Sequence, residues 1–266
     1  MSVLIFLALV IMAIVQFIIY KRKQAKFNFS ESQAKIQELL TALGAGKQKY
    51  TDQAGRTILM IACSESNETR KGELSFFDVI KKSVETGIRV NAKSLKDGQT
   101  ALAYAAAQPY NSDVVAYLLK VGSDVSAKDH NGRTPLFAAV ESSDMTTYTS
   151  IVDRAPKVDQ TDNRGFTPLM VASKNMCIPV IRDLLDRGAD AKLTNKQGEN
   201  VYDIAEKHKY EHIKRGGNSA HPDQYGEHNH GIKEIVRELN CIVNDKRFKP
   251  QKYVAPIRES GEDVGD

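Results

Sequence analysis

One six-residue pattern occurs four times in this chain, as Thr57-Ile-Leu-Met-Ile-Ala62, Thr100-Ala-Leu-Ala-Tyr-Ala105, Thr134-Pro-Leu-Phe-Ala-Ala139 and Thr167-Pro-Leu-Met-Val-Ala172. A weaker fifth copy, Asn200-Val-Tyr-Asp-Ile-Ala205, follows. The copies begin at positions 57, 100, 134, 167 and 200, which are 43, 34, 33 and 33 residues apart. A period near 33 residues predicts a solenoid of stacked, similar units. Solenoids usually offer a long binding surface to a partner rather than a catalytic cleft.

Each copy has the features of a turn followed by a capped helix. A glycine stands two positions before it, and glycine accepts the positive φ that tight turns require. The Thr or Asn that opens the copy offers a side-chain oxygen to the first free amides of a helix. Pro135 and Pro168 follow at the first helical position, where the missing N–H costs nothing. We therefore expect a turn, a capped helix and a second helix in every repeat. The glycines are Gly55, Gly98, Gly132, Gly165 and Gly198.

This pattern resembles the ankyrin repeat, and the resemblance extends over residues 31–246. The segments Val114–Asp124 and Val180–Asp190 match the second helix and the following loop of that family. Turn aspartates that the family expects stand three residues before the glycine, at Asp52, Asp129 and Asp162. The resemblance implies an all-α, ankyrin-like helical repeat solenoid of about five to six repeats, with half-repeats that cap its ends.

The chain departs from the family pattern at several positions. The family usually has a histidine after the leucine of the pattern, and that histidine bonds neighbouring repeats. The residues found there are Met60, Ala103, Phe137, Met170 and Asp203. In addition, Leu95 and Asn195 replace the turn aspartate. We expect the fold to tolerate these changes and the affected turns to be less rigid.

Residues 3–20 form an apolar run in which Gln16 is the one strongly polar residue. As a helix the run would span about 27 Å, close to the ~30 Å hydrocarbon core of a bilayer. A cluster of basic residues, from Lys21 to Lys26, follows directly. The alternatives are a cleaved signal peptide, which would have small residues at the end of the run, and a buried core helix, which would show an amphipathic break.

The sequence therefore predicts a single-pass anchor within residues 1–20 and a linker over residues 21–30. Because positive charge resists translocation, the basic flank places the repeats on the cytoplasmic side of the membrane. A helix that begins at Ser30 or Ser32 and ends at Gly44 is expected to cap the array.

Two insertions interrupt the repeat period, one over residues 64–75 and a larger one over residues 209–231. Insertions between repeat elements usually form loops on one face, and such loops are often functional. A final helix over residues 232–243 is expected to close the stack. The tail over residues 247–266 is basic, then broken by proline, then acidic, which predicts disorder.

The composition narrows the class of protein. The net charge is +4, and basic and acidic residues are interleaved along the chain. The sequence therefore lacks the basic stripes that are typical of a nucleic-acid binder. Three cysteines lie far apart, as in a reducing compartment, and Cys63 stands where the repeat has a small buried residue. We expect no cofactor.

The motif His208-Lys-Tyr-Glu211-His212 has the H-x-x-E-H spacing of some zinc peptidases. Two histidines one helical turn apart can bind zinc, and the glutamate would act as the base. His221, His228 and His230 would be further ligands. Such a short match arises easily in a segment rich in His and Glu, so we expect no catalytic residue here. A zinc-dependent hydrolase remains the alternative function.

Binding to a protein partner is the better interpretation. In this type of repeat, side chains beside the turn glycine and just after the first helix project from the concave face and do not pack in the core. The candidate binding residues at these positions are His130, Asn131, Arg133, Glu141, Asn163, Arg164, Phe166, Lys174 and Lys196. Arginine and aromatic residues together are favoured at interface hot spots. The prediction is a membrane-anchored scaffold that captures a protein with an acidic surface. An inhibitor or immunity protein is a narrower form of the same hypothesis.

Overall fold

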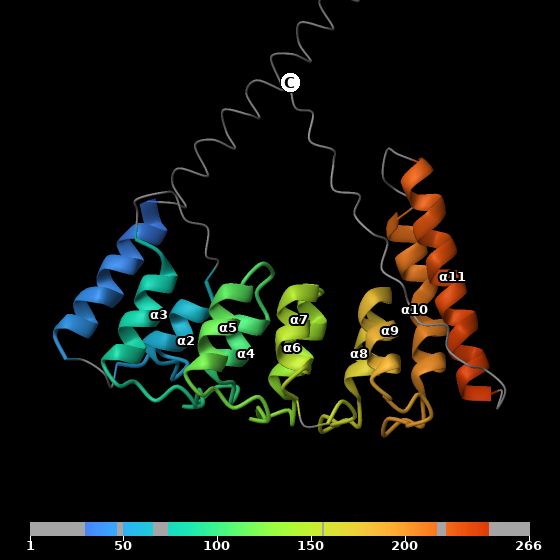
Figure 1. Ribbon diagram of the computed structural model, residues 1–266, viewed down its shortest axis with the longest axis horizontal. Coiled ribbons are helices and arrows are strands. Elements are labelled where there is room, and N and C mark those ends of the chain that lie inside the picture. The colour runs from blue at the N-terminus through green and yellow to red at the C-terminus, as the bar shows by residue number, and fades with distance from the viewer. Residues whose placement is uncertain (1–29, 47–49, 66–73, 156, 217–221, 245–266) are drawn as a thin grey trace, which may run out of the picture.

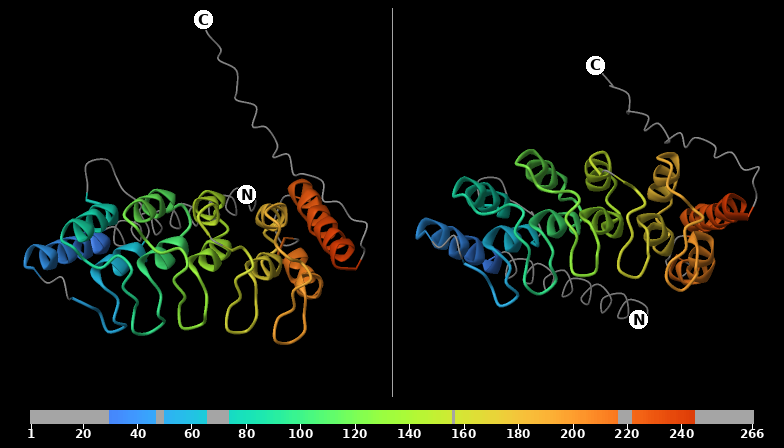
Figure 2. Two further views of the ribbon diagram at one scale, coloured as in Figure 1. Left: turned by 60° about the horizontal axis from the view of Figure 1, so that its bottom comes forward. Right: turned by 90° about the horizontal axis from the view of Figure 1, so that it is seen from below.

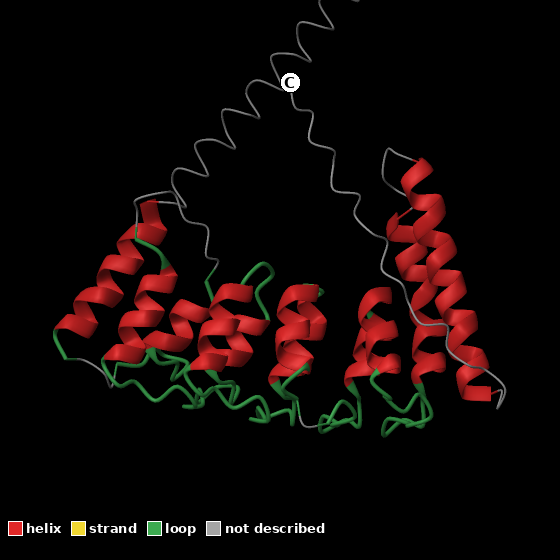
Figure 3. Cartoon of the chain, in the orientation of Figure 1, coloured by secondary structure: helices red, strands yellow, loops and turns green. Residues whose placement is uncertain are grey.

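The computed structural model describes residues 30–46, 50–65, 74–155, 157–216 and 222–244, with side chains except those of residues 210–230. This part of the chain folds into helices joined by turns and loops (Figures 1 and 3). The helices are residues 30–44, α2 (Ile58–Cys63), α3 (Phe76–Glu85), α4 (Ala101–Ala106), α5 (Ser112–Lys120), α6 (Pro135–Ser142), α7 (Met145–Val152), α8 (Pro168–Lys174), α9 (Ile178–Asp186), α10 (Val201–Gly216) and α11 (Pro222–Asn244).

The helices stack as pairs in two rows. Helices α2, α4, α6, α8 and α10 each contact the next in that order, and we call them the inner helices. Each inner helix also contacts the outer helix that follows it in the chain, from α2 with α3 to α10 with α11. Figure 2 shows the two rows from below. The structure is therefore the solenoid that the repeat period predicts.

The Thr or Asn at the start of the pattern caps the inner helix in four of the five repeats. The side-chain oxygens of Thr57, Thr100 and Thr167 accept from the backbone N–H three residues later, at 3.4, 3.4 and 3.2 Å. Asn200 does the same at 3.1 Å. Thr134 makes no such bond, so the capping prediction fails at α6.

The turns before the inner helices lie side by side along one edge of the solenoid (Figure 2). We call them the finger turns: residues 52–56, 94–99, 129–133, 162–166 and 195–199. The glycine of each has a positive φ, as expected. Backbone bonds join every finger turn to the one before it: Lys96 N to Ala54 O (3.1 Å), His130 N to Asp97 O (2.8 Å), Asn163 N to Asn131 O (2.7 Å) and Lys196 N to Arg164 O (2.9 Å). These bonds make the finger turns one continuous strip.

Other side-chain oxygens accept hydrogen bonds in the two turns that lack the family's aspartate. Within the second finger turn, Asp97 accepts a 3.0 Å hydrogen bond from the backbone N–H of Gln99, and Leu95 is exposed. In the fifth, Asn195 accepts from the backbone N–H groups of Gln197 (2.9 Å) and Glu199 (3.0 Å). A carboxylate or amide oxygen thus accepts backbone hydrogen bonds in both turns in which the aspartate is replaced. The expected loss of rigidity stays a prediction.

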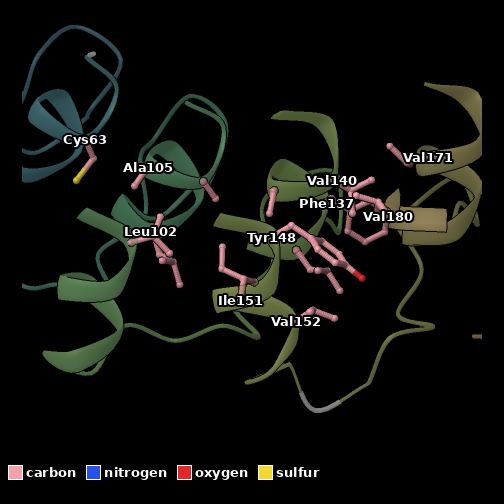
Figure 4. Close-up of a cluster of buried hydrophobic side chains, with 14 of the residues drawn as sticks. Cys63, Leu102, Ala105, Phe137, Val140, Tyr148, Ile151, Val152, Val171 and Val180 are labelled. Atoms are coloured by element: carbon pink, nitrogen blue, oxygen red, sulfur yellow. The ribbon is translucent and has the colours of Figure 1, made fainter. Parts of the chain in front are cut away.

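The apolar core runs between the two helix rows. Part of it, from Cys63 to Val180, is shown in Figure 4. Ala105, Ala139 and Ala172 have no exposed surface, so the inner helices approach one another without spare volume. Cys63 is also fully buried, as expected, and burial raises the pKa of its thiol.

The N-terminal cap has the predicted form. The helix of residues 30–44 buries Ile36, Leu39 and Leu43 against the core. Near its start, Gln33 Nε2 donates to Leu74 O at 2.9 Å, just before α3. This end of the helix therefore lies at the edge where α2 and α3 are joined, opposite the finger turns.

The C-terminal end differs from its prediction. The insertion over residues 209–231 was expected to form a loop, but α10 continues to Gly216 and α11 begins at Pro222. The expected final helix is therefore only the second half of α11. Its apolar residues Ile232, Ile235 and Leu239 are fully buried and hold it against the stack. Both α10 and α11 continue as helices into the insertion. The irregular composition of the insertion does not reveal this.

Several predictions concern residues outside the described ranges. They are the membrane anchor and linker before residue 30, most of the first insertion (residues 66–73) and the tail over residues 247–266. Among the described residues, no helix has the length and hydropathy needed to span a bilayer.

Candidate partner-binding surface

Two positions of each repeat meet on the inner face, which is the surface formed by the inner helices and the finger turns. The first is the residue after the finger glycine, and the second is the residue seven positions after the Thr or Asn that opens the inner helix. We call them the palm pair. The five palm pairs are Arg56 and Ser64, Gln99 and Ala107, Arg133 and Glu141, Phe166 and Lys174, and Glu199 and Lys207.

Three of these pairs are bonded directly. Arg56 Nη1 donates to Ser64 Oγ at 3.2 Å. Arg133 Nη2 and Glu141 Oε1 form an ion pair at 2.5 Å, and Lys207 Nζ bonds Glu199 Oε1 at 3.0 Å. In these three repeats the two positions are therefore neighbours in space across the inner face. In the repeats of α6 and α10, each pair also cancels its own charge.

Arg133 is less available than the sequence suggested. Its side chain is only 22% exposed, and its guanidinium lies 5.3 Å from the ring centre of Phe137. Glu141 compensates the charge. Arg133 and Glu141 thus form a structural pair on the inner face, and neither presents an uncompensated charge to a partner.

Phe166 is not the freely exposed anchor that was expected. It is half-buried and packs against the apolar core. The guanidinium of Arg164 lies 5.0 Å from the centre of its ring, and the Arg164 side chain is 65% exposed. Asp162 stands 3.5 Å from Arg164 Nε, but its carboxylate already accepts the backbone N–H groups of Arg164 and Phe166, each at 2.8 Å. The accessible feature is therefore a guanidinium stacked on an aromatic ring.

In this repeat the first palm position holds Phe166, where the neighbouring repeats have Arg133 and Glu199. The second palm position holds Lys174, which ends α8 and is exposed. Lys196, in the next finger turn, is exposed as well, and its N–H is bonded to Arg164 O. Arg164, Phe166 and Lys174 thus belong to the repeat of α8, and Lys196 comes from the finger turn that is bonded to it. We call these four residues the α8 cluster.

The remaining candidates lie in the finger turns, where several of them hold neighbouring turns together. Asn163 Nδ2 donates to His130 O at 2.9 Å, and Asn131 O accepts the N–H of Asn163. A Cβ on Gly132 would come within 2.4 Å of Asn163 Oδ1, so the two fingers are in tight contact. His130 and Asn131 are exposed at the finger tips and lie beside the α8 cluster rather than within it.

Sequence reasoning missed a second group on the inner face. Tyr104 donates its hydroxyl to Asp97 Oδ2 at 2.7 Å, and the Arg56 guanidinium lies 5.8 Å from the Tyr104 ring centre. Burial and the bond to Asp97 raise the pKa of Tyr104 to about 12, so its phenol stays neutral. The sequence could have indicated this group, because Arg56 occupies the same repeat position as Arg133.

The structure does not show how the side chains of the zinc motif lie relative to one another. His208 lies on α10, whereas Glu211 and His212 belong to the part of that helix whose side chains are not described. Within the described residues, no group of three or more possible ligands could hold a metal ion.

Comparison with known proteins identifies the family. The family model for ankyrin repeats in three copies matches residues 25–129, 71–153 and 110–195, which together span more than half of the chain. The protein therefore belongs to the ankyrin repeat family.

Three curated proteins are similar over part of their length. An ankyrin repeat protein of Acanthamoeba polyphaga mimivirus is 33% identical over 87 residues, which are 33% of this chain and 11% of that protein. The tyrosine-protein kinase HTK16 of Hydra vulgaris is 44% identical over 80 residues, 30% of this chain and 10% of the kinase. The neurogenic locus Notch protein of Drosophila melanogaster is 34% identical over 100 residues, 35% of this chain and 4% of Notch. The chain thus covers about a tenth or less of each relative.

Proposed function

We propose that this protein is a scaffold that captures a protein partner on its inner face, with the α8 cluster as the centre of the contact. The observation that carries the proposal is the contrast between neighbouring repeats. Arg133 pairs with Glu141 on one side and Glu199 with Lys207 on the other, whereas the repeat of α8 presents the exposed guanidinium of Arg164 stacked on the ring of Phe166. Family membership supports the general role, because repeat solenoids bind partners along such surfaces.

The chemistry of the α8 cluster indicates the kind of partner. Arg164 can bond a carboxylate with two parallel N–H groups while its flat face stays on Phe166. Lys174 and Lys196 add point charges at the rim, where they chiefly raise the association rate. The partner should therefore present acidic side chains around a small apolar group that covers the exposed edge of Phe166.

Membrane attachment is a second part of the proposal and rests on the apolar run of residues 3–20. The helix of residues 30–44 begins at the edge where α2 and α3 are joined, because Gln33 bonds Leu74 there. A tether that enters at this edge would direct the finger turns away from the bilayer. The inner face would then remain accessible to a partner in the cytoplasm, the side on which the basic flank is expected.

Site-specific photo-cross-linking in cells tests the proposal. A photoreactive side chain is placed at Arg164 or Lys196 on the inner face, and at Ala116 on the outer helix α5 as a matched control. We expect the same protein to be cross-linked from both inner positions and not from position 116. A partner that is captured equally from position 116, or only from there, would exclude the inner face as the binding surface.

A further inference from the structure

The C-terminal end of the solenoid presents polar residues where every earlier repeat buries apolar or small ones. Six positions after the opening Thr or Asn, the first four repeats have Cys63, Ala106, Val140 and Ser173, all without exposed surface. The fifth has Glu206, which is half-buried. Tyr202, also half-buried, likewise replaces the leucine that the other repeats bury. These positions face the next repeat, so in α10 they form the end face of the described stack.

A cavity of about 380 Å³ opens on this end face between α10 and α11. Its apolar surface comes from Tyr202 and from Val236, which is only 5% exposed. Three cations also line the cavity: Lys209 on α10, and Lys233 and Arg237 on α11. The one carboxylate in the lining, that of Glu206, is bonded to Lys209. The lining therefore carries a net charge of +2 around an apolar floor, the charge pattern expected of a site for an acidic segment.

The cations on α11 are arranged to receive an extended chain. Lys233 and Arg237 are four residues apart and both exposed, so they lie on one side of the helix. Val236 lies between them and is held in the core. A segment with several carboxylates and an aliphatic side chain could bond the cations and place the aliphatic group against Tyr202.

We propose that residues 259–266 of the same chain occupy this cavity. The sequence Glu259-Ser-Gly-Glu-Asp-Val-Gly-Asp266 carries four carboxylates and one aliphatic residue, Val264, and so matches the lining in charge and in apolar character. The described part of the chain ends at Asn244, on the same helix as Lys233 and Arg237. The proposal does not depend on the identity of any binding partner.

The length of the connection fits this docking. Lys233 lies about 16 Å from Asn244 along α11, at 1.5 Å per residue. Residues 245–258 would connect the two, and a flexible linker of that length, roughly 14 residues, has an average span of roughly 20 Å. Effective concentration is greatest when the average span of a linker matches the distance between the sites. Docking would also cover the open end of the array, which terminal repeats otherwise have to keep polar.

Zero-length cross-linking of carboxylates to amines in the full chain, at high dilution and mapped by mass spectrometry, tests the proposal. We expect links from the carboxylates of residues 259–266 to Lys233 or Lys209. Arg237→Glu adds a like charge and keeps both lysines, so these links should fall at least about tenfold relative to the unmodified chain. Lys120→Glu, an equal change of charge at the exposed end of α5, should leave them unchanged. Circular dichroism confirms that both variants remain folded.

Three outcomes would overturn the proposal. The acidic segment could form no link to α10 or α11, or could link to lysines all over the surface to a similar extent. The links could also survive in Arg237→Glu. Mixing unlabelled chains with chains labelled with ¹⁵N distinguishes the remaining occupant, because links between the two isotopic forms would show that the segment docks on a second copy.

Discussion

Tyr148 on α7 donates a 2.7 Å hydrogen bond from its hydroxyl to Asp183 Oδ2 on α9, in the next repeat. Tyr148 is fully buried, and Figure 4 shows its ring among the aliphatic side chains of the core. Arg187 bonds the same carboxylate at 2.6 Å and reaches Asp153 at 2.7 Å. A polar bridge therefore joins the outer helices of two neighbouring repeats.

This bridge predicts unequal effects of removing its two ends. Tyr148→Phe removes one hydroxyl and leaves Asp183 bonded to Arg187, so it should lower the free energy of unfolding by only about 0.5–1.5 kcal/mol. Asp183→Ala leaves a buried hydroxyl without a partner and should cost about 1–3 kcal/mol. Urea unfolding measures both. If Asp183→Ala were the milder change, the hydroxyl would not depend on this bond.

Capping gives a matched pair of variants. The Thr167 hydroxyl caps α8 by accepting from Met170 N, whereas Thr134 makes no side-chain cap bond at α6. Thr167→Ala should therefore destabilise the protein by about 1 kcal/mol, and Thr134→Ala by clearly less. Equal shifts of the urea midpoint in the two variants would contradict the assigned difference in capping.

Overpacking tests the register of the stack. Ala139 and Ala172 are fully buried where α6 and α8 meet their neighbours. Substitution of either with Leu forces the helices apart and should cost about 1–3 kcal/mol. Ala116→Leu, on the exposed side of α5, is the control and should have almost no effect. Thermal unfolding compares the three variants, and normal stability of both buried variants would show that the register is wrong.

Partner binding should separate the two arginines of the inner face. Arg164→Glu reverses an exposed charge in the α8 cluster and should slow association, most strongly at low salt where screening is least. Arg133→Glu places a second carboxylate beside Glu141, so its main effect should be on folding stability rather than on binding. Kinetic binding measurements at two salt concentrations, together with unfolding of each variant, distinguish these effects. A larger loss of association rate in Arg133→Glu would move the centre of the site away from α8.

Acid sensitivity should depend on Asp97. Burial alone would raise the pKa of this carboxyl, but hydrogen bonds from Ser94, from the N–H of Gln99 and from Tyr104 outweigh it and lower the pKa. Because the folded pKa lies below the unfolded value of about 3.9, the stabilisation is present above that pH and is lost as the pH falls through the folded pKa. Asp97→Asn should therefore lower stability at neutral pH and flatten its decline in acid. Unfolding measured from about pH 6 to pH 2 checks this, with exposed Asp113→Asn as the control.

The sequence alone determined the architecture, because a repeated unit has to satisfy the same local requirements each time. The period, the glycines at positive φ and the alanines in the helix contacts can be read directly from the chain. They predicted the helix order, the buried alanines and the side-chain caps of four of the five inner helices. The helix of residues 30–44 was found for the same reason, since its apolar spacing is regular.

Only the tertiary structure decided which side chains of the inner face are available. The sequence treats Arg133 and Arg164 alike, since both lie beside a finger glycine. In the folded chain Glu141, eight residues after Arg133, lies across from it and cancels its charge, while Phe166 becomes half-buried under Arg164. Availability depends on which side chains bond when each finger turn packs against the inner helix that follows it, and the residue types alone do not show those bonds. The end-face cavity arises in the same way, because α10 and α11 bring its three cations together from two helices.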